Sequence, residues 1–341
     1  MKKRFLSVFL TMLSVTVFAQ EPSLNDLLHQ GLALHDKGDY AGAIKKYDEI
    51  LGRDEGFYLA YPEKSYSLLM AGKYDDCVEL CKKTLKKFRD SVQNKNVYVT
   101  YGSALDAMGK ADDAIKMYAE GMRRYPDFYL LPFNKGVTEC RLKNYDDAVA
   151  DMERSVTLKP THASSHQYLA YAIYPSNKVA AAMALTTFLV LEPGGQRAEN
   201  NLKILLGIVN GNVEKKDGKN ITISVTPELV DTKEKGADDF RTTELMMSFS
   251  SASDMTKDSL TAMQKLAGKL EFFAIAAPKK KGFFSNYYVT YLSGLKDNHF
   301  LETAAYLLYY SAKDENDRRW LEANKDKVGA LQQWTAVHLG K

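Results

Sequence analysis

Residues 106–118, DAMGKADDAIKMY, decide the fold because three other segments of the chain repeat their pattern. The other copies are HDKGDYAGAIKKY at 35–47, LMAGKYDDCVELC at 69–81 and CRLKNYDDAVADM at 140–152. The corresponding turn residues, spaced by 34, 37 and 34 positions, are Gly38, Gly72, Gly109 and Lys143. Self-similarity at such a period indicates a repeat protein in which each unit is one supersecondary motif.

Each copy has the pattern of two helices joined by a tight turn. Glycine at the turn indicates a left-handed backbone that ends the first helix. A small residue in the second helix (Ala43, Ala114 or Ala148) allows close approach, and a larger residue four positions later fills the remaining space. Prolines at 126, 160 and 193 mark where second helices stop. Because one hairpin cannot bury its apolar face alone, we predict an all-α solenoid of stacked hairpins.

The pattern resembles the tetratricopeptide repeat family over residues 24–193. Small residues stand where that family has them in the first helix: Gly31, Ser65, Gly102 and Gly136. The resemblance implies a right-handed superhelix of about five helical hairpins followed by a capping helix at 198–209. The fifth unit departs from the pattern, since Pro175 and Ser176 occupy its turn, but Pro193 keeps the spacing.

The first twenty residues, MKKRFLSVFLTMLSVTVFAQ, have the pattern of a secretory signal peptide. A basic start precedes an uncharged stretch, and Val17 and Ala19 are small enough for cleavage before Gln20. The alternative, a membrane anchor, needs about 20 apolar residues, and this run is shorter. We therefore expect an exported protein, periplasmic or surface-associated. Segment 186–206, TTFLVLEPGGQRAENNLKILL, is similar to a group of exported tetratricopeptide proteins common in Bacteroidetes, which implies the same compartment.

Composition excludes several classes of protein. With 45% apolar and 26% charged residues, the 341-residue chain is a folded protein, and its length suggests two domains. Cleavage of the signal removes three basic residues and no acidic one, which leaves 43 of each sign. A neutral chain is a poor nucleic-acid binder, because that binding requires basic charge against phosphates. Three cysteines are too few for a disulfide framework.

The chain divides into three expected regions after the signal. Repeats and a capping helix cover 24–210, a linker with a short extended segment covers 211–225, and a helical C-terminal domain covers 226–341. Residues 221–225, ITISV, alternate β-forming side chains and are the only expected strand, whose pairing the sequence leaves open. Apolar residues at helical spacing and many aromatic side chains predict C-terminal helices that pack onto the last repeat as an irregular cap.

Residues that could perform chemistry do not form a recognisable site. The chain has none of the motifs that hold nucleotides, activate a hydrolase serine or bind catalytic zinc. His162 and His166 lie one helical turn apart, but no third ligand has matching spacing. Cys77 and Cys81 are also one turn apart, a geometry unsuited to a disulfide, and we interpret them as buried packing residues. We predict no cofactor, no bound metal and no enzymatic activity.

The first helix of each repeat lines the concave surface of a solenoid, which predicts a groove for a protein or peptide partner. Aromatic residues, methionine and scattered charge in this groove suit a segment with apolar anchors. The simpler interpretation is that these residues only cover the inner face, or that C-terminal helices fill it. We predict a scaffold, such as an envelope assembly or secretion accessory, whose partner the sequence does not identify. The predicted groove residues are His35, Tyr66, Met70, Asp106, Phe133, Arg141 and His166.

Two alternatives stay open. An enzyme, for example a glycan-processing one, would have its site in the aromatic C-terminal half, which has only His299 and His338 and no recognisable acid–base pair. A membrane-surface protein, without a spanning segment, would expose Lys279–Lys281 together with Phe283 and Phe284. The simpler interpretation of the lysines is a solvated loop, because three lysines give only weak attraction to a membrane.

Overall fold

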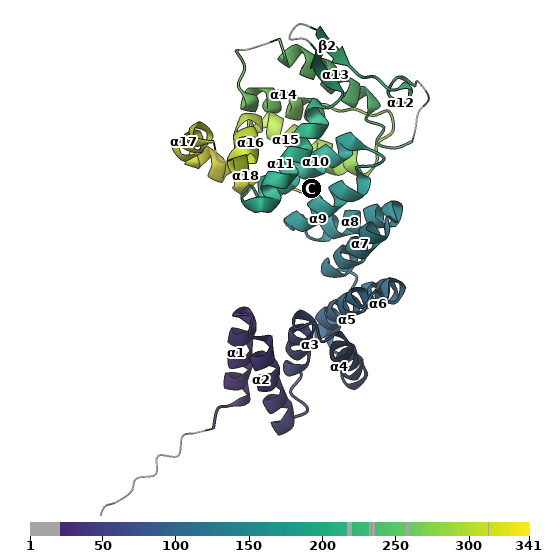
Figure 1. Cartoon of the computed structure of the whole chain (residues 1–341), viewed down its shortest axis with the longest axis vertical. Helices are drawn as coiled ribbons and strands as arrows, with labels where there is room; N and C mark the ends of the chain where they lie inside the picture. The colour runs from purple at the N-terminus through teal and green to yellow at the C-terminus, as the bar shows by residue number, and fades with distance from the viewer. Residues whose placement is uncertain (1–20, 217–219, 232, 234–235, 257–258, 313) are drawn as a thin grey trace, which may run out of the picture. The chain divides into compact units, whose positions relative to one another are not determined.

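The computed structural model describes residues 21–216, 220–231, 233, 236–256, 259–312 and 314–341. In these residues the chain forms eighteen α-helices and one two-stranded sheet (Figure 1). The all-α prediction is therefore confirmed. The predicted signal peptide, residues 1–20, lies outside the described residues. None of the helices in the described ranges combines the length and the apolar content needed to cross a bilayer.

Two compact units divide the chain between Arg89 and Asp90. The first unit has two helical hairpins in which each helix packs against the next. Gly38 and Gly72 end the first helix of each hairpin with φ angles of 80° and 73°, which a residue with a β-carbon rarely adopts. The two predicted glycine turns are confirmed. The helices are α1 (Leu24–Asp36), α2 (Tyr40–Arg53), α3 (Ala60–Met70) and α4 (Tyr74–Lys87).

The pairing of a small with a large residue explains why the helices of each hairpin lie close together. A β-carbon on Gly31 of α1 would lie 2.5 Å from Cε1 of Tyr47 on α2. In the second unit, Gly102 faces the ring of Tyr118 in the same way. Both tyrosine rings are buried and occupy the space that the missing β-carbon leaves. The repeat spacing thus encodes one packing contact that recurs in successive hairpins.

The second unit begins with three more hairpins, so the described chain has the predicted five. Lys143 replaces glycine at one turn and adopts a φ of 65° there. The first helices of these hairpins contact one another in sequence order, as do the two helices within each hairpin. The helices are α5 (Lys95–Ala107), α6 (Ala111–Arg124), α7 (Leu130–Leu142), α8 (Tyr145–Leu158), α9 (Ala163–Ile173) and α10 (Lys178–Leu191), and the 3₁₀ turn η1 (Val92–Asn94) precedes them.

The remaining elements of the second unit follow the repeats. They are α11 (Gly195–Asn210), β1 (Val213–Lys216), β2 (Asn220–Ile223), α12 (Pro227–Val230), α13 (Arg241–Asp254), α14 (Ala262–Ala274), the π-helix η2 (Ser285–Val289), α15 (Thr290–Asp297), α16 (Leu301–Leu308), the 3₁₀ helix η3 (Tyr309–Ala312), α17 (Glu315–Ala323) and α18 (Lys325–His338). Helix α11 packs on α10, at the place expected for the capping helix.

Helix α10 is covered on every side, unlike the other second helices. All twelve residues from Val179 to Val190 are buried. Helices α9 and α11 pack against it, and α13, α16 and η2 also contact it. Its apolar residues belong to one core that continues through the C-terminal helices. The C-terminal helices therefore pack on the last repeat, where the sequence predicts an irregular cap, and they go further by enclosing α10 and sharing its core.

The strand prediction needs a correction. The expected strand at 221–225 is observed as β2, which pairs antiparallel with β1, with Val213 opposite Ile223 and Lys216 opposite Asn220. Residues 213–216 were expected to be part of the linker, because only Val213 among them is apolar and no alternation marks them as a strand. The described chain thus has a β-hairpin with two strands where the sequence indicates one.

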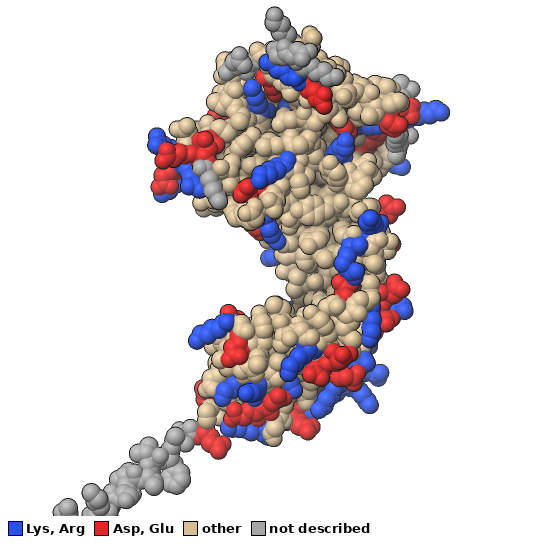
Figure 2. Space-filling model, in the orientation of Figure 1, with Lys and Arg blue, Asp and Glu red and all other residues tan. Residues whose placement is uncertain are grey.

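Charged side chains are mixed on the surface. On the face shown in Figure 2, Lys and Arg side chains lie interspersed with Asp and Glu. Many of them form ion pairs within one helix, such as Arg53 with Glu49 and Lys203 with Glu199. Such exposed pairs contribute little to stability, about 0–1 kcal/mol each.

Candidate functional site

The first helices of the second unit present one set of side chains that repeats every 34 residues. Phe133 of α7 corresponds to Gln167 of α9, Val137 to Tyr171, and Cys140 to Tyr174. Because α5, α7 and α9 contact one another in that order, these positions form a continuous surface. We call this surface the first-helix face and define it by Asp106, Phe133, Arg141, Tyr171 and Tyr174.

An ion pair crosses the first-helix face between α5 and α7. The Arg141 guanidinium donates through Nη2 to Oδ1 of Asp106. The side chain of Arg141 is 51% exposed, and no other group in the described residues accepts from its guanidinium. The pair brings together two predicted groove residues and leaves Arg141 with free donors for a carboxylate or a backbone carbonyl.

Aromatic rings occupy the neighbouring part of the face. Phe133, which is half-buried, lies edge-to-face on His162 at a centroid distance of 4.8 Å and on Tyr168 at 5.7 Å. Tyr168 in turn lies 5.9 Å from Tyr171. Burial and the nearby Arg197 cation lower the pKa of His162, which favours a neutral imidazole among these rings. These ring contacts connect Phe133, a predicted groove residue, to Tyr168 and Tyr171 of α9.

A hydrogen-bond network fixes the orientation of Tyr171. Gln167 donates through Nε2 to the Tyr171 hydroxyl at 2.8 Å, and that hydroxyl donates to Oδ1 of Asn201 at 2.8 Å. Asn201 itself donates through Nδ2 to the carbonyl of Arg197 at 2.8 Å. The network links α9 to α11 and holds the Tyr171 ring, which is 36% exposed, in one orientation.

An apolar pocket of about 310 Å³ opens beside Tyr171. Its walls are Ala170, Tyr171, Tyr174, Leu185 and Ile204, contributed by α9, α10, α11 and the turn after α9. Tyr174 is 43% exposed and Ile204 is 37% exposed, although both are large and apolar. A concave apolar site with hydrogen-bonding groups at its edge is the usual form of a binding site.

Tyr171, Tyr174 and Ile204 are not among the residues that the sequence predicts. The signal that identifies the two tyrosines is the spacing from Gly136 to Ala170, which is 34 residues. Ala170 is the small residue of the fifth unit, and Tyr171 follows it as Val137 follows Gly136. The contribution of Ile204 depends on the packing of α11 beside α10, which no repeat spacing specifies.

The placement of His166 in a groove is wrong. Its side chain is fully buried, its Nδ1 lies 2.7 Å from the Tyr288 hydroxyl, and its Nε2 lies 2.7 Å from the carbonyl of Pro160. Burial lowers the pKa of His166 to about 4. At the repeat spacing of 34 residues, His166 corresponds to Pro132, which is also buried. The fifth turn has no glycine to set the phase, so the prediction selected the residue before Gln167, which is the position that corresponds to Phe133.

Three predicted residues lie in the first unit. The ring of His35 stacks on Tyr66 with a centroid distance of 4.9 Å, and its Nδ1 lies 2.7 Å from the Ser67 hydroxyl. Tyr66 and Met70 are 44% and 45% exposed. The structure therefore brings His35 and Tyr66 together on α1 and α3 and leaves Met70 accessible at the end of α3.

Many aromatic residues of the C-terminal half pack against one another. Tyr288 and Tyr291 are buried, Tyr291 stacks on Trp334 at 5.8 Å, and Tyr306 stacks on Trp320 at 3.8 Å. These rings are therefore packed against one another and do not line an open active site.

One cavity of about 760 Å³ does combine a tyrosine, Tyr310, with a carboxylate, Glu322. Glu322 is 70% exposed and paired with Lys325, whereas a general acid needs a desolvated carboxyl. In the ranges that the structure covers, no three His, Cys, Asp or Glu side chains cluster as a metal site would require.

The side chains that a membrane-surface protein would insert are packed inward. Phe284 is buried, and Phe283 is half-buried and stacks on Tyr287 at 5.2 Å. The three preceding residues, Lys279–Lys281, are exposed. The joint exposure of lysines and phenylalanines that the membrane-surface alternative requires is not observed, because Phe284 lies in the core and Phe283 packs against it. Cys77 and Cys81 are buried free thiols, as the sequence predicts.

The geometry defines a class of protein built from stacked helical hairpins. Residues 101–163, from within α5 to the start of α9, match the family model of the tetratricopeptide repeat. The helical hairpins of this chain are tetratricopeptide repeats.

Known proteins share this repeat region. The "Protein STIP1 homolog" of Dictyostelium discoideum is 25% identical over 134 residues, which cover 38% of this chain. The chain spans only 24% of the length of that relative.

Two solved structures illustrate the similarity to known folds. TTC0263, a thermophilic repeat protein of Thermus thermophilus, is 17% identical with a TM-score of 0.47; the match covers 54% of this chain and all of that one. YrrB, described as a repeat protein with an unusual peptide-binding site, is 16% identical with a TM-score of 0.39; the match covers 53% of this chain and 92% of that one.

Proposed function

We propose that this protein is an exported, non-enzymatic scaffold that binds protein segments on the first-helix face. The observation that carries the proposal is the apolar pocket beside Tyr171, in which Tyr174 and Ile204 stay exposed. A fixed tyrosine, a half-exposed apolar wall and an arginine with free donors on the first-helix face are the components of a hot spot for a peptide anchor. The protein serves as an envelope assembly or secretion accessory.

The pocket and the ion pair specify the kind of segment that fits. A cavity of about 310 Å³ accepts one large apolar side chain, such as leucine, methionine or phenylalanine. Arg141 can pair with a carboxylate of the segment in exchange for Asp106, which lies on the same face. Rings such as Phe133 offer further apolar contact along α7. The ligand is therefore an acidic segment with an apolar anchor.

Export is the part of the proposal that depends on residues 1–20. The basic start, the uncharged stretch and the small residues before Gln20 support it. The absence of enzymatic activity is supported by the inward packing of Tyr288 and Tyr291 and by the exposure of Glu322, which leaves that carboxyl unsuited to acid–base chemistry.

A peptide library displayed on phage and selected on the full-length mature chain tests this function. We expect the enriched peptides to share one large apolar residue near acidic residues. Fluorescence anisotropy then measures their affinity for the native chain and for a Tyr174→Ala/Ile204→Ala variant. Truncation of two hot-spot side chains is expected to weaken binding about 30-fold or more.

Tyr145→Ala is the matched control, because Tyr145 is also 36% exposed but lies on the second helix α8. Its affinity is expected to equal that of the native chain, and circular dichroism checks the helical content of each variant. Peptides that bind the Tyr174→Ala/Ile204→Ala variant as tightly as the native chain would show that the pocket is not the site. Failure to enrich any peptide would contradict the function itself.

A further inference from the structure

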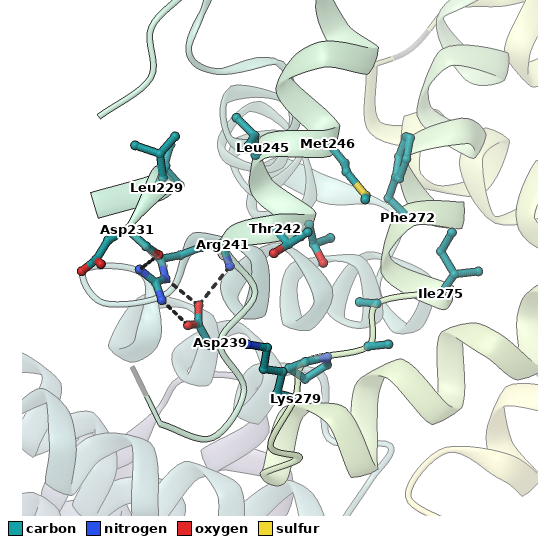
Figure 3. A pocket seen from close by; sticks show the side chains of 15 residues that line it. Leu229, Asp231, Asp239, Arg241, Thr242, Leu245, Met246, Phe272, Ile275 and Lys279 are labelled. Carbon is teal, nitrogen blue, oxygen red and sulfur yellow. Dashed lines mark hydrogen bonds and ion pairs between the residues drawn. The ribbon is translucent and has the colours of Figure 1, made fainter. Parts of the chain in front are cut away.

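A second pocket lies entirely within the C-terminal helices of the second unit. It has a volume of about 680 Å³ and is bounded by α12, the start of α13 and the segment that follows α14. Figure 3 shows Met246, Phe272 and Ile275 along one side and the Arg241–Asp239 pair on the other. The large apolar side chains that line it are Leu229, Val230, Leu245, Met246, Phe272 and Ile275.

Several of these apolar side chains are half exposed to solvent. Met246 is 50% exposed, Ile275 is 53% exposed and Val230 is 56% exposed. Phe249, one turn after Met246 on α13, is 55% exposed and extends the apolar surface beyond the pocket. Large apolar residues gathered around a concavity indicate a binding site, because their exposure to water is unfavourable.

The polar groups of the pocket are already used within the protein. Arg241 donates through Nε and Nη2 to the Asp239 carboxylate, through Nη1 to the carbonyls of Glu228 and Asp231 at 2.9 Å, and through Nη2 to the carbonyl of Lys233. These bonds use all five N–H groups of the guanidinium. The Asp231 carboxylate accepts the amide hydrogen of Lys233 at 3.0 Å. The Arg241 guanidinium and the Asp239 carboxylate are therefore paired with each other, whereas Asp231 keeps its negative charge and further acceptor sites.

Lys279 is the cationic lining residue that remains available. Its side chain is exposed, and the described part of the chain gives its ammonium group no hydrogen bond or ion pair. Lys280 and Lys281 follow it and are also exposed. Asp239 is paired with Arg241, and Figure 3 shows Asp231 on the far side of Arg241 from Lys279, so the free charge at the end of the pocket that Lys279 occupies is positive. The pocket thus combines a long apolar wall with one cationic end.

We propose that this pocket binds a free, single-chain anionic amphiphile of the fatty-acid class. The hydrocarbon chain lies against Met246, Phe272 and Ile275, and the carboxylate pairs with Lys279. A volume of about 680 Å³ lies within the range of about 300–1,000 Å³ that small-molecule sites occupy. A fatty acid has a single polar group, which matches a pocket that offers one free cation.

Peptides and membranes fit the same surface less well. A peptide brings backbone N–H and carbonyl groups that would be desolvated, and the saturated Arg241 and Asp239 cannot pair with them. Insertion into a bilayer would need protruding apolar anchors, whereas Met246 and Ile275 line a concavity and Phe283 and Phe284 pack toward the core. The free amphiphile therefore accounts best for the distribution of charge and apolar surface.

Titration of the full-length mature chain with a fluorescent polyene C18 fatty acid, below its micellar concentration, tests the proposal. We expect a saturable increase in emission with one site per chain. Hexadecanoate is expected to displace the probe, and hexadecyltrimethylammonium, with the same chain length and opposite charge, to do so about tenfold less well. Equal displacement by both compounds would contradict the assignment of Lys279.

Substitutions locate the site. Met246→Asp places a charge in the apolar wall and is expected to weaken probe binding about tenfold or more. Lys279→Glu is expected to weaken it about three- to tenfold, the effect of reversing one partly exposed ion pair. The matched controls are Val337→Asp, at a residue 52% exposed on α18, and Lys86→Glu, at an exposed lysine of α4; both are expected to bind as the native chain does.

Three outcomes would overturn the proposal. The first is the lack of saturable binding by the native chain. The second is unchanged binding by Met246→Asp together with a loss in Tyr174→Ala, which would place the amphiphile in the pocket on the first-helix face. The third is sedimentation with vesicles of phosphatidylglycerol and phosphatidylethanolamine in the absence of binding to the monomeric probe, which would assign the surface to a membrane.

Discussion

Tyr288 and His166, 122 residues apart in the sequence, are joined by a hydrogen bond of 2.7 Å between the tyrosine hydroxyl and Nδ1 of the imidazole. The other ring nitrogen of His166 lies 2.7 Å from the carbonyl of Pro160, which can only accept. Nε2 therefore carries the hydrogen, Nδ1 accepts, and Tyr288 donates. The bond fastens the last repeat to the C-terminal helices and requires a neutral imidazole.

Stability of the second unit is expected to decrease in mild acid because of His166. Burial lowers its pKa to about 4, whereas the unfolded chain has the ordinary value of about 6.5. Between these values the unfolded state binds a proton that the folded state does not. The free energy of unfolding is thus unaffected by this group above pH 6.5 and falls by about 3 kcal/mol as the pH decreases toward 4.

Urea unfolding of the native chain and of His166→Gln from pH 7 to pH 4.5 measures this effect. The native chain is expected to be the more stable at pH 7, and the difference is expected to narrow as the pH falls, since glutamine does not titrate. A difference that stays constant over this range would show that His166 does not remain neutral in the folded state.

Asp238 is expected to be essential for the attachment of the segment before α13 to the start of η2. Its carboxylate accepts the amide hydrogens of Gly282 at 2.9 Å, Phe284 at 2.8 Å and Ser285 at 3.0 Å, and it also accepts the Ser285 hydroxyl. Asp238→Asn removes the charge and one acceptor atom, which leaves buried donors unpaired. We expect a loss of about 2–4 kcal/mol in the free energy of unfolding.

Asparagine is the informative replacement because Asp238 adopts a φ of 57°, a conformation that asparagine also tolerates. Asp75→Asn, at an exposed acid in the first turn of α4, is the control and is expected to change stability by less than about 1 kcal/mol. Equal effects of the two substitutions in thermal and urea unfolding would be inconsistent with the role of Asp238.

Gly31, the small residue of the first helix α1, is not expected to be replaceable even by alanine without loss of stability. Gly31→Ala would bring a β-carbon within 2.5 Å of the buried Tyr47 ring, so the two helices must separate. We expect the first unit to lose about 2 kcal/mol or more, within the range for overpacked cores. Gly52→Ala in α2 is the matched control, because nothing lies within 4 Å of its added β-carbon.

Gly52→Ala is expected to stabilise the first unit by about 0.5–1 kcal/mol through its helix propensity. Denaturant unfolding followed by circular dichroism measures both variants. A destabilisation by Gly52→Ala as large as that by Gly31→Ala would mean that helix interiors, and not the contact with Tyr47, limit substitution by alanine.

The mature chain is expected to begin at Gln20. Expression of the full sequence in a Gram-negative host and mass spectrometry of the periplasmic protein measure its N-terminus. Ala19→Arg places a large charged residue before the cleavage site and is expected to leave the precursor uncut. Recovery of the native chain in the cytoplasm with Met1 retained would contradict export.

Local patterns account for the part of the fold that the sequence predicts. Turn glycines such as Gly72, and small–large pairs such as Gly102 with Tyr118, act between residues fewer than 40 positions apart, so a repeated spacing reveals them. The sequence also predicts that the C-terminal helices pack onto the last repeat, because aromatic helices with no repeat of their own need a surface against which to bury those side chains, but it does not predict that they enclose α10. Strand β1 was missed because its charged residues have no alternation until β2 lies beside them.

The binding face is harder to predict than the hairpins, because it depends on helix phase and on distant partners. Phe133 and the Asp106–Arg141 pair follow from repeats with a glycine or lysine at the turn. In the fifth unit Pro175 stands in place of the turn glycine, and the prediction selected the buried His166, whereas Tyr171, five residues later on the same helix, is exposed. The partner that buries His166, Tyr288, lies more than a hundred residues away.

The enclosure of α10 has a consequence for how this protein can change its length. Gene duplication lengthens repeat proteins by inserting whole hairpins. Each inserted hairpin must be able to pack against a hairpin on either side of it. A hairpin inserted after Leu191 would separate α10 from α11, α13 and α16 and break the shared core. New repeats can therefore be accommodated only upstream of α9. A repeat added after α10 would disrupt the core that α10 shares with the C-terminal helices.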